Sequence, residues 1–160
     1  MSEAESGSAQ RQQLEGEFVL AMRRTGLVSQ LLSQAAAERI GINVTDLNCL
    51  NVVALTGSMT AGELARATGL TTASITGVLD RLEESGFVRR ERDAADRRRV
   101  NIVLNASRAL RDVAPVFAPM LKAWRAAASR YSDDELRQFA EFQQEVERIM
   151  RDQLTRLRAE

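Results

Sequence analysis

Residues 60–104 decide the fold of this chain, and they read TAGELARATGLTTASITGVLDRLEESGFVRRERDAADRRRVNIVL. At their start, Thr60 and Glu63 have the Thr-x-x-Glu spacing of a capping box, in which each side chain binds a backbone N–H at a helix N-terminus. This spacing predicts a short helix. The helix is expected to end at Gly69, because glycine readily adopts the left-handed conformation that follows many helices.

A second helix is predicted directly after this glycine. Thr71 or Thr72 can cap its N-terminus, and Gly86 supplies its stop. The apolar residues between them recur at i, i+3, i+4 and i+7, the spacing of one buried helix face. These residues are Ile75, Val78, Leu79 and Leu82. Two short helices around a tight glycine turn predict a helix-turn-helix.

The hydrophobic period changes after the second helix. Phe87–Arg92 has an extended, charged pattern, and Val100–Leu104 alternates with a period of two, as a half-buried strand does. The polar segment Asp93–Arg99 between them predicts the tip of a β-hairpin. Because a helix-turn-helix followed directly by a hairpin is a winged helix, the predicted fold class is mainly α with a small β-hairpin wing.

Further helices are predicted on both sides of this segment. Residues 1–10 are expected to be disordered, and apolar residues three to five apart predict one long helix over residues 10–39. Thr45 can cap a helix that runs to about Leu55, before Gly57.

Two more helices are predicted after the hairpin. Asn105 can cap a long helix to about residue 131, in which Pro115 and Pro119 each remove a backbone donor and predict a kink or break. Ser132 and Glu135 form another capping box, and an apolar stripe follows it.

These patterns predict the domain organisation. Residues 41–104 are assigned to a winged helix-turn-helix domain, and residues 11–40 and 105–160 to a helical dimerisation region. The apolar stripes of the terminal helices have no obvious partner within a winged helix, so we expect a second copy of the chain to cover them in a two-fold homodimer.

The exposed side of the second helix is the candidate surface for reading DNA bases. It carries small and hydroxyl-bearing residues, which let a helix settle deep in the major groove of double-stranded DNA. The candidates are Thr71, Thr72, Ser74, Thr76 and Gly77, with Ala73 and Asp80 on the same face. The alternative is an ordinary solvated helix face, because Ser and Thr are common on surfaces.

The hairpin tip is a second candidate. Although the formal net charge of the chain is zero, Phe87–Arg99 holds six arginines and three acids. An arginine at the tip of a thin wing can enter the minor groove, and a carboxylate can hold its guanidinium beforehand. Arg98 and Asp96 fit these two roles. The predicted phosphate contacts come from Arg81, Arg89, Arg90, Arg97 and Arg99. The alternative is a solvated charge run at a sheet edge.

The segment from Thr60 to Asn105 resembles the DNA-binding domain of the MarR family of bacterial transcriptional regulators. The resemblance rests on LDRLEESGFVRR at residues 79–90 and on DRRRVNIVL at residues 96–104. It implies an obligate homodimer, joined by its terminal helices, that binds a pseudo-palindromic operator and is often released by a small ligand. It also places the wing arginine of the family at Arg98 and the supporting aspartate at Asp96.

Several classes of function are excluded or disfavoured. The chain has no histidine and one cysteine, Cys49, so zinc clusters and Ser-His-Asp triads are out of reach, and no metal, cofactor or catalytic residue is predicted. No apolar run approaches the roughly 20 residues that span a bilayer, and no signal sequence is recognisable, so we expect a cytoplasmic protein. Cys49 is expected to be inert packing.

Phe117, Met120 and Trp124 are the candidates for binding a small aromatic effector, although residues at helical spacing more often form core or interface. Two other functions stay open. One is a winged-helix protein-interaction module without DNA binding. The other is a small enzyme using the acids at residues 133–135, which more simply complement a helix dipole.

Overall fold

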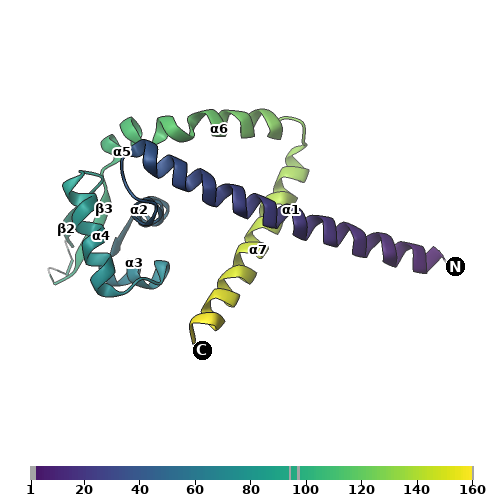
Figure 1. Ribbon diagram of the computed structural model, residues 1–160, viewed down its shortest axis with the longest axis horizontal. Coiled ribbons are helices and arrows are strands. Elements are labelled where there is room, and N and C mark those ends of the chain that lie inside the picture. Colours follow the sequence, from purple (N-terminus) through teal and green to yellow (C-terminus); the bar gives the residue numbers. More distant parts are fainter. Residues whose placement is uncertain (1–2, 94, 97, 160) are drawn as a thin grey trace. The chain divides into compact units, whose positions relative to one another are not determined.

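The computed structural model describes residues 3–93, 95–96 and 98–159 of the chain. The helices and strands are α1 (Glu3–Ile40), α2 (Val44–Thr56), β1 (Ser58–Thr60), α3 (Ala61–Thr68), α4 (Thr72–Glu84), β2 (Val88–Arg92), β3 (Val100–Leu104), α5 (Ala106–Asp112), α6 (Ala114–Ala128) and α7 (Asp133–Ala159) (Figure 1). The chain divides into two compact units, Met1–Val116 and Phe117–Glu160.

The predicted helix-turn-helix is formed by α3 and α4. The capping box of α3 is confirmed, since the Thr60 N–H donates to Glu63 Oε2 at 2.7 Å and the Glu63 N–H donates to Thr60 Oγ1 at 3.2 Å. Gly69 follows α3 with a φ of 73°, in the left-handed region that glycine adopts without steric cost. Thr71, one of the two proposed residues, caps α4.

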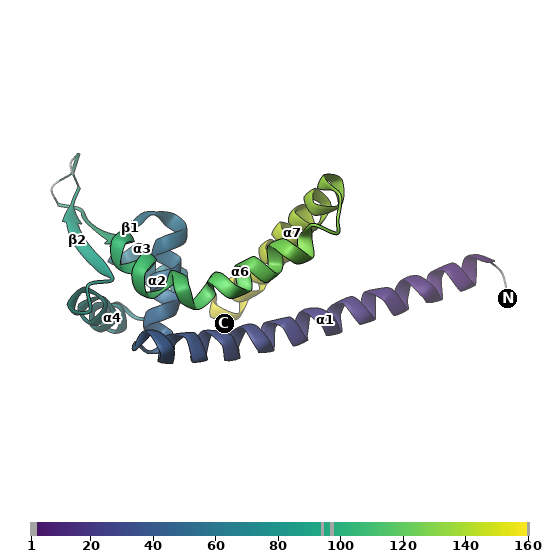
Figure 2. The ribbon, with the colours of Figure 1, turned by 90° about the horizontal axis from the view of Figure 1, so that it is seen from above.

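The wing belongs to a three-stranded antiparallel sheet with the order β1-β3-β2. The predicted hairpin of β2 and β3 is confirmed, with Arg90 opposite Ile102, and Figure 2 shows it extending away from the helices of its unit. The third strand, β1, is an addition that the sequence did not predict, and it pairs Met59 with Ile102 on the other side of β3. Ile102 is therefore flanked by strands on both sides and is buried.

The hydrophobic core lies between α2, α3, α4 and the sheet. The four residues predicted for the inner face of α4 are all buried, and each contributes about 1.5–3 kcal/mol by leaving water. The core consists of Cys49, Leu50, Val53, Met59, Leu64, Ile75, Val78, Leu79, Leu82, Phe87, Val88 and Ile102. This packing holds α4 and the wing in one unit.

Two expectations for the N-terminal helices are corrected. Residues 3–10, which were expected to be disordered with residues 1–2, belong to α1, in keeping with the good helix formers Glu, Ala and Gln among them. Met1 and Ser2 lie outside the described residues. Asn43 rather than Thr45 caps α2, because the helix begins at Val44 and Thr45 is already inside its first turn.

The predicted break after the wing is confirmed, and it lies at Val113, between α5 and α6. The ring of Pro115 would meet the carbonyl of residue 111 in a continuous helix, which accounts for the interruption. Pro119 lies inside α6 without ending it. Asn105 caps α5 as predicted, and its side-chain amide donates to the Gly86 carbonyl at 2.9 Å. Thus α5 is part of the first unit. The predicted dimerisation region, to which α5 was assigned, stays a prediction.

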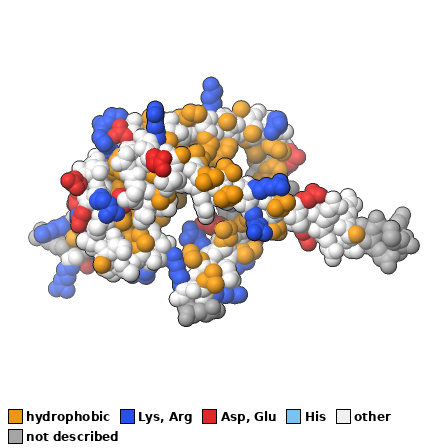
Figure 3. Space-filling model, in the orientation of Figure 1, with side chains coloured by type: hydrophobic (Ala, Val, Ile, Leu, Met, Phe, Trp, Pro, Cys, Tyr) orange, Lys and Arg blue, Asp and Glu red, His pale blue; other side chains and the backbone are white. Residues whose placement is uncertain are grey.

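The second unit consists of the remainder of α6 and α7. Its predicted capping box is confirmed, with the Ser132 N–H donating to Glu135 Oε2 at 2.8 Å and the Glu135 N–H donating to Ser132 Oγ at 3.3 Å. Of its described residues only Val146 is buried, whereas Phe139, Phe142 and other large apolar residues are exposed. Hydrophobic side chains are visible on α6 and α7 in Figure 3. No described helix is long and apolar enough to cross a membrane.

Candidate nucleic-acid interface

The outward face of α4 carries the residues predicted to read bases. Thr72, Ala73, Ser74 and Thr76 are exposed, and Gly77 is half-buried beside them. No charged residue occurs between Thr71 and Gly77, so this half of the helix presents small neutral groups. Such a surface can approach a groove floor closely, while the helix N-terminus favours a nearby phosphate.

The hydroxyl groups on this face are partly engaged with the helix itself. Thr71 Oγ1 accepts the Ser74 N–H at 3.2 Å and lies 2.9 Å from Ser74 Oγ. Thr76 Oγ1 donates to the Thr72 carbonyl at 3.0 Å, which leaves its oxygen lone pairs as acceptors. Thr71 and Ser74 therefore shape the start of α4, and Thr72 and Thr76 present their hydroxyl groups on its exposed face.

The wing tip is organised by Asp93, a residue that was not among the sequence-based candidates. Its Oδ1 accepts the N–H groups of Ala95 at 2.8 Å and Asp96 at 3.1 Å, and its Oδ2 accepts the Asn101 side-chain amide at 2.9 Å. These bonds, the one from Ala95 foremost, hold the pKa of Asp93 below its usual range. Aspartate before a polar turn is a known turn signal, and it could have indicated this residue.

The predicted role of Asp96 is corrected in its detail. Its Oδ1 accepts the backbone N–H of Arg98 at 3.0 Å, so the carboxylate fixes the main chain of the turn rather than the guanidinium. The side chain of Arg98 is exposed, and among the described residues it has no ion-pair partner. Arg97 lies outside the described residues. Arg98 is consequently the cation of the described wing tip that is available to a polyanion.

Three other wing arginines, Arg89, Arg90 and Arg99, are in ion pairs, and their phosphate contacts stay predictions. Arg90 binds Asp80 of α4 at 2.7 Å and also binds Glu83 of the same helix. The pKa of Arg90 is raised, chiefly by its hydrogen bond with Asp80. Arg90 thus ties β2 to α4, and Arg89 pairs with Glu91 in its own strand.

Arg99 ties the wing to α3. Its Nη2 lies 3.0 Å from Glu63 Oε1 and 3.1 Å from Oε2, while its Nε donates to Asn101 Oδ1 at 3.1 Å. The pKa of Glu63 is lowered, first by the backbone N–H of Thr60 and its hydroxyl, and also by Arg99. The capping box of α3 and the base of the wing therefore share one carboxylate.

Arg81, the remaining predicted phosphate contact, binds Asp46 with two of its nitrogens. Its side chain is half-exposed, whereas that of Asp46 is buried. Cys49 lies on the same helix as Asp46 and is fully buried. Burial foremost, with the negative charge of Asp46, raises the pKa of the Cys49 thiol to about 11. The thiol is therefore kept protonated, in agreement with its predicted role as inert packing.

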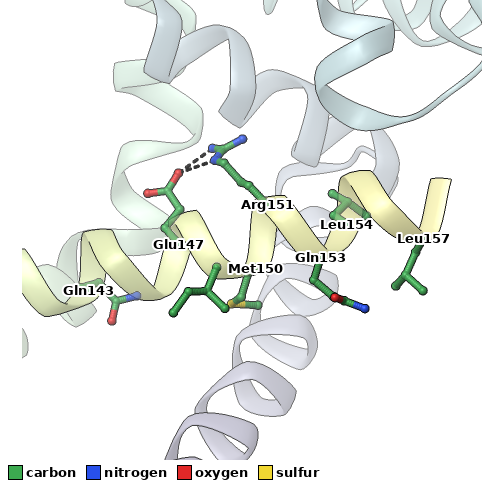
Figure 4. A pocket seen from close by; sticks show the side chains of 8 residues that line it. Gln143, Glu147, Met150, Arg151, Gln153, Leu154 and Leu157 are labelled. Atoms are coloured by element: carbon green, nitrogen blue, oxygen red, sulfur yellow. Dashed lines mark hydrogen bonds and ion pairs between the residues drawn. The ribbon is translucent and has the colours of Figure 1, made fainter. Parts of the chain in front are cut away.

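The three residues proposed for effector binding lie on α6, where Trp124 is exposed and Phe117 and Met120 are half-buried. None of them lines the open groove of about 880 Å³ that runs along α7. Figure 4 shows that groove, whose lining residues are Gln143, Glu147, Ile149, Met150, Arg151, Gln153, Leu154 and Leu157. An open apolar strip on one helix is more typical of a protein interface than of an enclosed ligand site.

Comparison with known proteins decides the family. The sequence model of the MarR family matches residues 40–99. YcgE, an HTH-type transcriptional regulator of Bacillus subtilis (strain 168), is 39% identical over 149 residues, which cover 92% of this chain and 96% of YcgE. The chain belongs to the MarR family. It is an HTH-type transcriptional regulator, and the predicted assignment to a regulator rather than an enzyme is confirmed by this membership.

Solved MarR-like structures share the fold. A mutant of Staphylococcus aureus MepR bound to an oligodeoxyribonucleotide is 20% identical, with a TM-score of 0.55 over 82% of this chain and 97% of that one. A second MepR mutant, from a clinical isolate, is 20% identical and reaches a TM-score of 0.68 over 82% of this chain and 96% of that one. The predicted winged-helix fold class is confirmed, and the third strand is added to it.

Proposed function

We propose that this MarR-family chain is a homodimeric repressor that binds a pseudo-palindromic operator in double-stranded DNA and is released by a small ligand. The observation that carries the proposal is a pair of surfaces on one compact unit: the neutral outer face of α4 and the exposed Arg98 at the wing tip. The MepR structure with an oligodeoxyribonucleotide supports the proposal by sharing the fold. Such a regulator acts in the cytoplasm of a bacterium.

Each surface suits one groove of DNA. Thr72, Ala73, Thr76 and Gly77 would face base edges in the major groove, where small side chains permit close approach. Arg98 would enter the minor groove, where the negative potential is enhanced. Arg90 and Arg99 support this mode indirectly, because their ion pairs fix the wing against α4 and α3.

The homodimer is proposed from the apolar surface of the terminal helices. On α1, Leu14, Leu27 and Leu31 are each more than half exposed, at 55, 59 and 62%. The groove along α7 adds Ile149, Leu154 and Leu157. Apolar side chains exposed in such number are rarely left in water, and a second copy related by a two-fold axis would cover those of each helix on both chains at once. Two recognition helices would then address half-sites about one DNA turn apart.

The ligand response is proposed from Phe117, Met120 and Trp124, which recur at helical spacing on α6, after the break at Val113. A ligand there would need to change DNA affinity by only about 1–3 kcal/mol to alter operator occupancy. Because Trp124 is the one tryptophan, its fluorescence reports on binding by small aromatic acids. A compound that releases DNA without changing this fluorescence would place the effector elsewhere.

The test of the proposal is selection of binding sites from random duplexes of about 30 base pairs, long enough for two half-sites. The expected product is an inverted repeat with half-sites about one turn apart, bound by a dimer in light scattering at micromolar concentration. If no duplex is enriched and the purified chain stays folded, a winged-helix protein-interaction module becomes the better hypothesis for the function. A stable monomer would contradict the dimer.

A further inference from the structure

Asp46 is a buried charge in the first turn of α2, with only 2% of its surface exposed. Its Oδ1 lies 2.6 Å from Arg81 Nη2, and its Oδ2 accepts from Arg81 Nε at 2.9 Å. The side-chain amide of Asn43 donates to the same Oδ2 at 2.8 Å. Both carboxylate oxygens thus accept hydrogen bonds, and two of these bonds hold the planar guanidinium of Arg81.

Stability alone gives little reason for this arrangement. Moving a carboxylate out of water is costly, and well-packed apolar residues in place of a buried ion pair are often equally stable or more so. The pair does provide a fixed direction, because two parallel hydrogen bonds set both the place and the plane of a guanidinium.

The third nitrogen of Arg81 lies over the outward face of α4. A Cβ built on Gly77 would be 3.5 Å from Arg81 Nη1, which places this nitrogen one turn back along the helix, beside the proposed base-reading residues. Within the described part of the chain no acceptor takes a hydrogen bond from Nη1. Since residue 77 has no side chain, nothing of its own covers the free edge of the guanidinium.

We propose that Asp46 is a positioning residue for DNA binding, which holds Arg81 so that its Nη1 edge contacts a backbone phosphate beside the groove occupied by α4. The inference rests on the proposed function and adds a residue from α2 to it. A phosphate is the expected target because Nη1 lies near the middle of α4, whereas base edges are contacted from the N-terminal part of a recognition helix. Because the hydrogen bonds to Asp46 already fix the Arg81 side chain, less conformational entropy is lost when Arg81 contacts the phosphate.

Asp46→Asn gives a result that a simple charge effect cannot imitate. The substitution removes a negative charge, so electrostatics alone would strengthen DNA binding. If Asp46 positions Arg81, binding weakens instead, by about tenfold, the size of one good charge-assisted contact. Glu84→Gln is the matched control, because it removes an exposed acid at the end of α4, the helix that carries Arg81, and is expected to leave binding unchanged or slightly tighter.

A double-mutant cycle separates positioning from folding. Arg81→Met combined with Asp46→Leu replaces the ion pair by apolar side chains and is expected to keep the fold, checked by thermal melting. It should bind the selected duplex about tenfold more weakly than wild type. Its log–log salt dependence should be shallower by about 0.9, as expected for one lost phosphate contact. The affinity of this double variant should equal that of Arg81→Met alone, because Asp46 acts through Arg81.

The probe is the duplex that the wild-type chain selects from the random library, measured by fluorescence anisotropy. Wild-type binding by Asp46→Asn, or by the folded double variant, would overturn the inference while leaving the proposed function in place. Failure of the wild-type chain to select any duplex would overturn both. Weakened binding by Asp46→Asn together with unchanged binding by Glu84→Gln supports the positioning role.

Discussion

Gly77→Ala is predicted to make the chain more stable and a poorer DNA binder. Glycine inside a helix costs about 0.5–1 kcal/mol relative to alanine, because it loses more backbone freedom on folding. At Gly77 the new methyl group would lie 3.5 Å from Arg81 Nη1, an ordinary van der Waals contact, and the backbone φ is not in the left-handed region. The helix should therefore gain most of this free energy, equivalent to about 1–4 °C in Tm.

The same methyl group should impair DNA binding, because residue 77 lies on the face of α4 proposed to enter the major groove. A methyl group forced into a closely packed contact costs about 1–3 kcal/mol, or roughly 5- to 150-fold in affinity. Gly62→Ala is the matched control. A Cβ at Gly62 in α3 would be 3.8 Å from Arg66 Nη1, so this variant should also be stabilised while keeping its affinity for DNA.

Thermal melting by circular dichroism and fluorescence anisotropy with the selected duplex measure the two effects. A higher Tm with at least about fivefold weaker binding for Gly77→Ala, and normal binding for Gly62→Ala, is the expected pattern. A lower Tm for Gly77→Ala would show that the space beside Arg81 does not accommodate a methyl group. Unchanged affinity would show that this face of α4 does not approach DNA closely.

Three further outcomes follow from the geometry. The pKa of Glu63 is lowered in the folded state, so its stabilising effect is complete above its unfolded pKa of about 4.3 and disappears as the pH falls through the lower folded pKa. Glu63→Ala should therefore lower Tm at pH 7, and the melting curves of the wild type and the variant should converge in acid. Cys49, buried with a pKa of about 11, should react with a thiol reagent at pH 8 only after unfolding, and rapid reaction of the native chain would contradict its burial. Leu82→Ala should lower the free energy of unfolding by about 2–5 kcal/mol in urea titrations, because Leu82 is fully buried in the core; a loss below about 1 kcal/mol would argue against that packing.

The features that could be predicted from the sequence are those with local causes. The capping boxes at Thr60 and Ser132 need only residues three apart, and the left-handed glycine after α3 is a single-residue signal. The buried stripe of α4 follows from helical periodicity. The break near Pro115 follows from the missing N–H and the ring of one residue.

The features that were missed depend on contacts between distant residues. Strand β1 is three residues long and becomes a strand only by pairing with β3, more than 40 positions later. The Asp46–Arg81 pair joins residues 35 apart, and the Glu63–Arg99 pair joins residues 36 apart. A run of arginines has the same composition whether its members are free or paired, so the sequence could not distinguish the exposed Arg98 from its neighbours.

The most direct test of the central claim is the affinity of Arg98→Ala for the duplex that the wild-type chain selects, measured over a series of salt concentrations. Arg125→Ala removes the same charge from α6 and serves as the control. If the wing reads the minor groove, Arg98→Ala binds more weakly by about 1–3 kcal/mol, with an unchanged melting temperature, and Arg125→Ala binds like wild type. Equal affinities for wild type, Arg98→Ala and Arg125→Ala at every salt concentration would contradict the account.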